Sequence, residues 1–201
     1  MVDESRTRAR TRRAILDAAV TVLSKDQGAS LSDVAAVAGV GRTTVHRYFP
    51  ERSDLLEAIG ADLLEKVAAA TARAKLAEGP ALEAIDRLCQ EYFELGDGLM
   101  LMFELPEMMN WAGWEEETEA DRALTRLVER GHAEGDIDPE LDAPWVQQVL
   151  WSLLYAAWSH IRDGAPKHAT MARCLRTLRK ALASDVDRRD GQRGVGRDLQ
   201  R

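Results

Sequence analysis

Residues 31–49 constrain the fold of this chain more than any other stretch. They read as two short helices on either side of a turn at Gly39, which is the outline of a helix-turn-helix. Glycine accepts the left-handed backbone that often follows a helix, and Ser32 is expected to cap the first helix. Val40 and Val45 are expected to hold the two helices in contact. The pattern predicts a helical pair with one polar face turned outward.

Six polar side chains form the outward face of the second helix of this pair: Arg42, Thr43, Thr44, His46, Arg47 and Tyr48. Such side chains suit DNA phosphates and base edges. An ordinary helical hairpin with a solvated polar face would show the same pattern. The flanks favour DNA binding, because a basic amphipathic helix is expected over about 10–25 and Pro50 ends the second helix before another long helix.

The charge distribution also favours a nucleic-acid partner for the N-terminal part. The whole chain carries a net charge of −7, but residues 1–50 hold eight Lys and Arg against five Asp and Glu. This leaves +3 on the first 50 residues and −10 on the rest. Because salt screens charge over roughly 8–10 Å, the local excess matters more for phosphate binding than the total.

Residues from about 10 to 57 resemble the DNA-binding domain of the TetR family of bacterial transcriptional repressors. The resemblance rests on an ordered set of residues: Arg13, Ile15, Leu16, Ala18, Ala19, Gly28, Asp33, Val34, Ala35, Ala38, Gly39, Val40, Thr44, Val45, His46, Arg47, Tyr48, Phe49, Arg52, Leu55 and Leu56. Three positions depart from the family pattern. His46 stands where tyrosine is usual, Gly41 where serine is frequent, and Arg52 where lysine is usual.

The resemblance implies roles for individual residues. Base-edge contacts are expected from Arg42, Thr43, His46 and Arg47, and phosphate contacts from Ser32, Thr44, Tyr48 and Arg52. It also implies a homodimer on a nearly palindromic double-stranded operator, since two recognition helices enter neighbouring major-groove faces. Repression is what the family implies, while the residues themselves leave activation open.

Helical periodicity continues through the rest of the chain, so the expected fold is all-α with about nine helices. A three-helix head is joined by a long fourth helix to a C-terminal ligand-binding and dimerisation domain. This fourth helix is expected to begin between Pro50 and Ser53 and to continue toward Ala77. Later helices are expected over about 81–96, 115–134, 143–163 and 167–183. The last two of these helices carry more apolar surface than packing within one domain would bury. We therefore expect them to pair with the same helices of a second subunit.

A soft, aromatic stretch at 99–114 suggests a pocket for a small hydrophobic effector, because methionine adapts to varied apolar shapes. The expected lining comprises Met102, Phe103, Met108, Trp111, Trp151, Tyr155 and Trp158. A core helix packed with flexible residues is the alternative. Glu104 and Glu107 would suit a cationic lipophilic ligand, or they are ordinary surface charges.

No catalytic residue, metal ligand or cofactor site is expected. The four histidines show no paired metal spacing, and no phosphate loop or nucleophile motif is present. Apolar runs are too short for a membrane span and no secretory signal is evident, so a cytoplasmic protein is expected. Cys89 and Cys174 are expected to be buried reduced thiols rather than a disulfide.

These inferences divide the chain into four parts: a flexible arm over 1–9, the DNA-binding domain over 10–57, the ligand-binding and dimerisation domain over 58–184, and a disordered tail over 185–201. The predicted function is that of a sequence-specific DNA-binding regulator released from its operator by a small hydrophobic ligand. The alternative is a helical ligand-binding or scaffold protein that no longer binds DNA.

Overall fold

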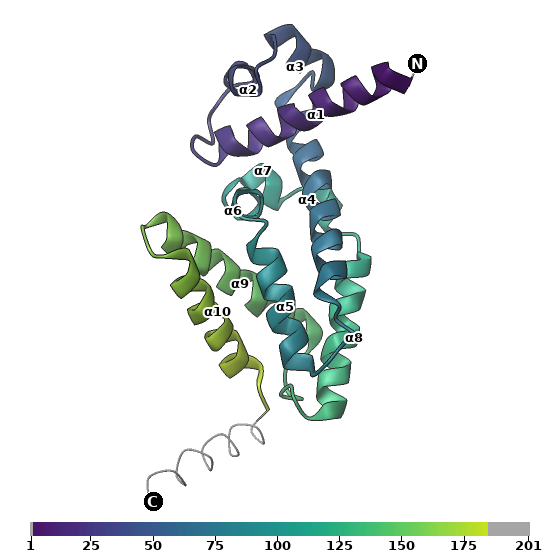
Figure 1. Ribbon diagram of the computed structural model, residues 1–201, viewed down its shortest axis with the longest axis vertical. Helices are drawn as coiled ribbons and strands as arrows, with labels where there is room; N and C mark the ends of the chain where they lie inside the picture. The colour runs from purple at the N-terminus through teal and green to yellow at the C-terminus, as the bar shows by residue number, and fades with distance from the viewer. Residues whose placement is uncertain (1, 185–201) are drawn as a thin grey trace, which may run out of the picture. The chain divides into compact units, whose positions relative to one another are not determined.

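The computed structural model describes residues 2–184, and the predicted tail over 185–201 lies outside the described residues. Within that range the chain is all-α, as predicted, with ten α-helices, one short 3-10 helix and no β-strand (Figure 1). None of the described helices combines the length and the apolar character that a membrane crossing requires. The described chain has one α-helix more than the nine expected, because Pro106 divides the soft stretch at 99–114 into two helices.

The first three helices match the expected head, with one correction at the N-terminus. Helix α1 spans Val2–Leu23, α2 spans Leu31–Ala38 and α3 spans Arg42–Tyr48. The flexible arm expected over 1–9 is therefore helical from Val2 onward, as the first turns of α1. Residues 2–10 contain no glycine or proline, so nothing in them interrupts a helix.

Helix α4 spans Arg52–Ala74 and ends earlier than the expected limit near 77. Lys75 follows it with a φ of 49°, in the left-handed region that stops a helix. Gly79 also has a positive φ, so the turn before α5 contains two left-handed residues.

Seven further elements follow: α5 (Ala81–Phe93), α6 (Asp97–Glu104), α7 (Pro106–Met109), a 3-10 turn (Ala112–Trp114), α8 (Glu119–Glu134), α9 (Ala143–Arg162) and α10 (Lys167–Leu182). Helix α8 starts four residues later than expected. Thr118 and Asp121 form a reciprocal capping box at its start, which satisfies backbone N–H groups in the first turn.

The chain forms two compact units that differ from the predicted domains. Among the described residues, the first contains 2–66 together with Leu95–Glu116, and the second contains Val67–Glu94 and 117–184. Residues 58–66 and helices α6 and α7 thus pack with the head rather than with the ligand-binding part. Each unit is described separately below.

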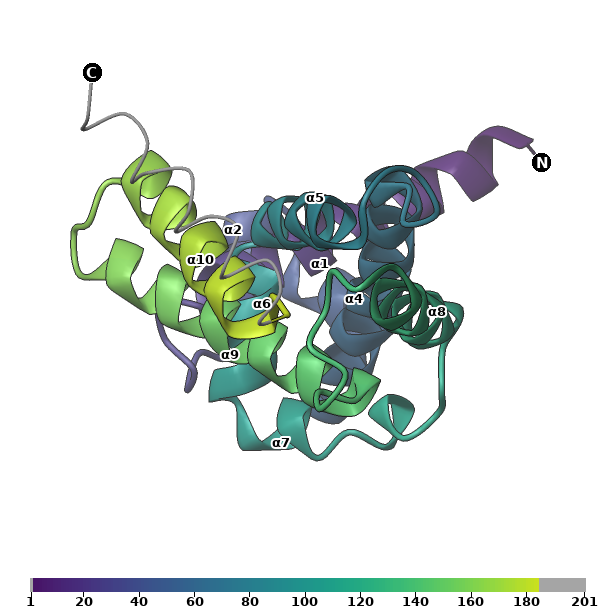
Figure 2. The same cartoon turned by 90° about the horizontal axis from the view of Figure 1, so that it is seen from below.

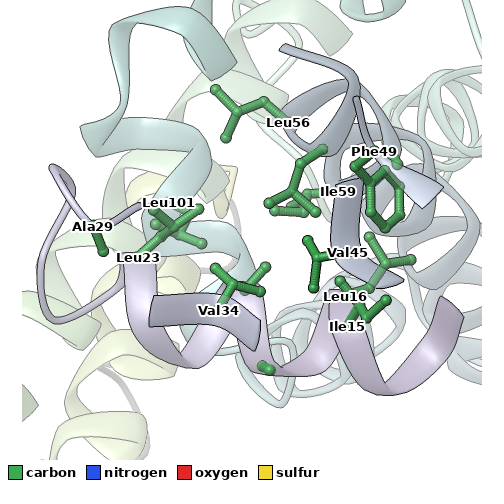
Figure 3. Packing of buried hydrophobic residues seen from close by; sticks show 14 of the residues in the cluster. Ile15, Leu16, Leu23, Ala29, Val34, Val45, Phe49, Leu56, Ile59 and Leu101 are labelled. Carbon is green, nitrogen blue, oxygen red and sulfur yellow. The ribbon is translucent and has the colours of Figure 1, made fainter. Parts of the chain in front are cut away.

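One apolar core holds the first unit together (Figure 3). The head contributes Ile15, Leu16, Ala19, Leu23, Val34, Val45, Phe49, Leu55 and Ile59 to it. Helix α6 adds Leu101 to the same cluster, α7 adds Met108, and Leu105 joins it from between these two helices. At the edge of this core the Arg13 guanidinium pairs with Asp17 on its own helix and with Asp62 on α4.

The second unit is a helical bundle in which α5 packs against α8, α9 and α10. Helices α9 and α10 run antiparallel and side by side, joined by a short loop (Figures 1 and 2). Their apolar stripes face inward, with Leu150 and Leu154 on α9 and Leu178 and Leu182 on α10 buried.

Candidate DNA-binding surface and effector cavity

The turn between α2 and α3 sets the direction of the recognition helix. Gly39 adopts a φ of 67°, and the backbone N–H of Val40 donates to the Ala35 carbonyl at 3.1 Å. Val45 on α3 is fully buried and anchors the helix against the head. The prediction of Val45 as the apolar contact between the helices is confirmed, and Val40 is half-buried against the same core.

The cap of α2 differs from the expected one. Ser30, not Ser32, is the N-cap, and its hydroxyl accepts from the Asp33 N–H at 3.3 Å. The Asp33 carboxylate accepts from the Ser30 N–H and hydroxyl, each at 2.7 Å, and the bond from that hydroxyl lowers the pKa of Asp33. Sequence reasoning missed this capping box because Ser30 lies before an apolar Leu31, which is itself the first helical residue. Ser32 is therefore left half-buried in the first turn of α2.

The polar face of α3 is open to solvent. Arg42, Thr43, His46 and Arg47 are exposed, and Thr44 and Tyr48 are half-buried. The Arg47 guanidinium lies 5.6 Å from the centre of the Tyr48 ring. His46 contacts the Pro50 carbonyl through Nδ1 at 3.3 Å, so one edge of its ring faces the end of its own helix.

Two contacts tie this face to neighbouring segments. The Tyr48 hydroxyl donates to the Arg8 carbonyl at 3.4 Å, which brings the first turns of α1 to the end of α3. Arg52, at the start of α4, donates to the Ala29 carbonyl at 2.7 Å and to the Gln27 carbonyl at 2.5 Å. The Arg52 side chain thus holds the loop that leads into α2.

The predicted effector residues fall into two groups. Met102, Phe103, Met108 and Trp111 belong to the first unit, and Trp151, Tyr155 and Trp158 belong to the second. In the first group Met108 is buried in the core of the head, while Met102 and Phe103 on α6 are half-buried. In the second group Trp151 stacks on Tyr92 with centroids 4.8 Å apart, and the Trp158 Nε1–H donates to the Phe93 carbonyl at 3.0 Å.

Met108 and Trp111 line a cavity of about 520 Å³ in the first unit, between the start of α4 and the segment after α7. Its other lining residues are Arg52, Ser53, Leu56, Glu57, Glu107, Asn110 and Ala112. Two carboxylates and one guanidinium therefore surround an indole and a thioether. Apolar walls with a few charged groups are typical of small-molecule sites.

A second hollow, of about 450 Å³, lies in the second unit between the end of α4 and α8. Alanines of both helices line it, together with Leu127, Arg126 and Arg130. Thr71 also borders it, and the Thr71 hydroxyl pairs with the Tyr92 hydroxyl at 2.7 Å. Sequence reasoning did not find this hollow; the alanine run on α4 was its one visible signal.

Known proteins resemble this chain both in the head and over most of its length. Residues 15–59 match the model of the bacterial regulatory proteins of the tetR family. The HTH-type transcriptional repressor LfrR of Mycolicibacterium smegmatis is 36% identical over 184 residues, which cover 89% of this chain and 94% of that protein.

Solved structures show the same similarity. The crystal structure of LfrR in complex with proflavine aligns with a TM-score of 0.69 and 34% identity, covering 84% of this chain and 95% of that one. A TetR-family transcriptional regulator from Haemophilus influenzae aligns with a TM-score of 0.68 at 11% identity, covering 89% and 99%, and so shows the fold alone. On this evidence the chain belongs to the tetR family of bacterial regulatory proteins, and it is a DNA-binding transcriptional regulator rather than an enzyme.

Proposed function

We propose that this regulator represses transcription by binding a palindromic operator as a homodimer, and that a small aromatic cation releases it. The exposed polar face of α3, opposite the fully buried Val45, is the observation that carries the DNA-binding part. A head that no longer binds DNA would have no need for this face. The proposed base contacts come from Arg42, Thr43, His46 and Arg47, and the phosphate contacts from Ser32, Thr44, Tyr48 and Arg52.

Arg47 is the strongest candidate for reading a base. Its guanidinium is exposed on the last turn of α3, and arginine can donate two parallel bonds to guanine O6 and N7. Arg52 already donates to two carbonyls, but a guanidinium carries five N–H groups. The remaining N–H groups leave it able to bind a phosphate while it holds the loop before α2.

Selection of bound duplexes from a random pool tests the DNA-binding proposal. The wild type is expected to enrich one palindrome, and Arg47→Ala to relax preference at one symmetric pair of positions, at a cost of about 1–3 kcal/mol. Arg47→Lys is the matched control, because it keeps the charge and loses the bidentate fork. Operator binding by Arg47→Lys should depend on salt about as strongly as that of the wild type, while the preference at the same pair of positions is lost. Enrichment of no sequence at low salt would contradict the proposal.

The cavity beside Trp111 is the proposed effector site. Its indole and the Met108 thioether offer apolar contact, and the carboxylates of Glu57 and Glu107 offer negative charge to a bound cation. Proflavine, bound in the LfrR structure, is a ligand of this chemical class. We therefore propose a planar aromatic cation as the effector of this chain.

Arg52 gives this site a route to the DNA-binding surface. It lines the cavity and at the same time donates to the Ala29 and Gln27 carbonyls in front of α2. A cation in the cavity would repel the Arg52 guanidinium. An effector that binds more tightly when Arg52 is displaced shifts the protein away from its DNA-binding state. The free energy that couples two such sites is typically about 1–3 kcal/mol.

Titration of the protein with proflavine, followed by tryptophan fluorescence, tests the effector site. Trp111→Ala and Glu107→Gln are each expected to raise Kd about tenfold, which corresponds to about 1.4 kcal/mol. Glu116→Gln is the matched control, because that carboxylate is exposed and does not line the cavity. If Trp151→Ala weakens proflavine binding and the Trp111 and Glu107 variants do not, the effector site lies at the second group of aromatic residues. Equal binding by all variants would contradict both positions.

Dimerisation is proposed through α9 and α10. Trp145 and Tyr155 on α9 are 56% and 38% exposed, which is unusual for large apolar side chains. A hollow of about 290 Å³ between the two helices, bordered by Ala156, lies on the same face. An isologous pairing of both helices would cover these groups.

Sedimentation of a charged variant tests this interface. Ala156→Arg places a long cation in the groove and is expected to shift the protein to monomer and abolish cooperative operator binding. Ala133→Arg, at an exposed position on α8, is the matched control and should remain a dimer. A dimer that persists in Ala156→Arg would exclude this face as the interface.

A further inference from the structure

The only two cysteines of the chain meet inside the second unit, although they lie 85 positions apart in the sequence. Cys89 lies on α5 and Cys174 on α10, and their sulfur atoms are 3.8 Å apart. Both are buried free thiols, so the prediction of buried reduced cysteines is confirmed for the described state. A disulfide bond is about 2.05 Å long, so the two sulfur atoms must approach each other by about 1.8 Å to form one.

The two thiols are chemically unequal. Hydrogen bonding from Cys89 lowers the pKa of Cys174, whereas the pKa of Cys89 is raised by Cys174 and by burial. The Asp86 carboxylate lies nearby and opposes ionisation of both sulfur atoms, although its own ion pair with Arg179 offsets part of that charge. Cys89 is fully buried and Cys174 is 5% exposed, so Cys174 is the sulfur that a reagent reaches, and its thiolate is the nucleophile.

Cys174 also has a path to small molecules. It borders the hollow of about 290 Å³ between α9 and α10. Thr170 lines the same hollow and is 4% exposed, and its hydroxyl has no hydrogen-bond partner among the described residues. A molecule as small as a peroxide fits in a hollow of this size. The proposed dimer would cover this face, so a reagent the size of a few water molecules fits the site better than a bulky one.

We propose that hydrogen peroxide oxidises Cys174 and Cys89 to a reversible disulfide that ties α5 to α10. The Cys174 thiolate attacks one peroxide oxygen and breaks the O–O bond, which yields a sulfenic acid and, after protonation of the leaving hydroxide, one water. The Cys89 sulfur then attacks the sulfenic sulfur and breaks the S–O bond, which releases a second water. The two sulfur atoms lose two electrons in total, and the peroxide gains them. The proposal is independent of the operator and the effector.

Oxidation of the purified full-length protein, in its native assembly, tests this site. After peroxide treatment and quenching, both thiols should be lost together and the chain mass should fall by about 2 Da, with dithiothreitol restoring both. Peptide mapping should join the segments that contain Cys89 and Cys174 within one chain. Because the bond closes a long loop, Tm should rise by about 5–10 °C.

Two single variants separate the proposed steps. Cys89→Ser keeps the nucleophile without its resolving partner, so a dimedone adduct should appear on Cys174. Cys174→Ser keeps Cys89 alone, and this thiol should stay reduced under the same treatment. Two titratable thiols after oxidation of the wild type would overturn the proposal. A bond between two different chains, or equal reactivity of the two single variants, would overturn it as well.

Discussion

The indole of Trp111 lies against the backbone of α4 at Gly60, where an added Cβ would come within 2.7 Å of the ring. The same indole meets Trp114 edge to face, with ring centroids 5.1 Å apart. The Trp114 Nε1–H donates to the Met108 carbonyl at 2.6 Å. Gly60 therefore allows the segment after α7 to pack on α4 and to form one wall of the proposed effector cavity.

Gly60→Ala is expected to lower the free energy of unfolding. Moving the Trp111 ring costs about 1–3 kcal/mol, and this exceeds the gain of roughly 1 kcal/mol from replacing glycine within a helix. Urea unfolding measures the difference. In a Trp111→Ala background the obstacle is gone, so the same Gly60→Ala change should become stabilising. Destabilisation of equal size in both backgrounds would show that the ring is not its cause.

Two serines at the start of α2 should respond differently to alanine. Ser30→Ala removes the capping box and should cost about 1 kcal/mol of stability. Ser32→Ala should leave unfolding within about 0.5 kcal/mol, because Ser32 is not the cap, and should weaken operator binding through a lost phosphate contact. Thermal unfolding and fluorescence anisotropy on the selected operator distinguish the two. The opposite ranking of the two variants in stability would contradict the assignment of the cap.

Arg52 is expected to stabilise the head as well as to contact DNA. Arg52→Ala removes its bonds to the Ala29 and Gln27 carbonyls and should cost about 1–2 kcal/mol in unfolding free energy. Arg52→Lys keeps the charge but cannot reach both carbonyls in the same way, so it should recover operator binding more fully than stability. Hydrogen exchange of residues 24–30 should accelerate in both variants. Unchanged hydrogen exchange of these residues would show that Arg52 does not stabilise the loop before α2.

The head was predictable because its information is local. The turn at Gly39, the buried Val45 and the polar face of α3 are fixed by residues within a few positions of one another. The packing of α6 on the head was not predictable, because it depends on contacts between Leu101 and residues far away in the sequence. The periodicity shows that a residue is apolar, but it does not show which core the residue joins.

The site predictions divide in the same way. Arg42, Thr43, His46 and Arg47 lie together because one short helix carries them. The seven predicted effector residues share only their apolar and aromatic chemistry, and they belong to two different units. Glu57 and Arg52, which border the cavity beside Trp111, come from α4 and gave no aromatic or methionine signal. The division of the stretch at 99–114 at Pro106 was readable in principle, since proline ends a helix at the preceding residue.

Tyr92 should make stability fall at alkaline pH. Burial raises the pKa of its hydroxyl from 10.0 to about 12 in the folded protein. Between those values the unfolded chain releases the phenol proton and the folded chain retains it, so stability is fully present below pH 10 and falls as pH rises toward 12. Tyr92→Phe should remove this part of the pH dependence, at a cost of about 1 kcal/mol at neutral pH from the lost bond to Thr71. Urea unfolding of both proteins at pH 7 and pH 11 checks it, and an equal fall in both would show that other groups cause the loss.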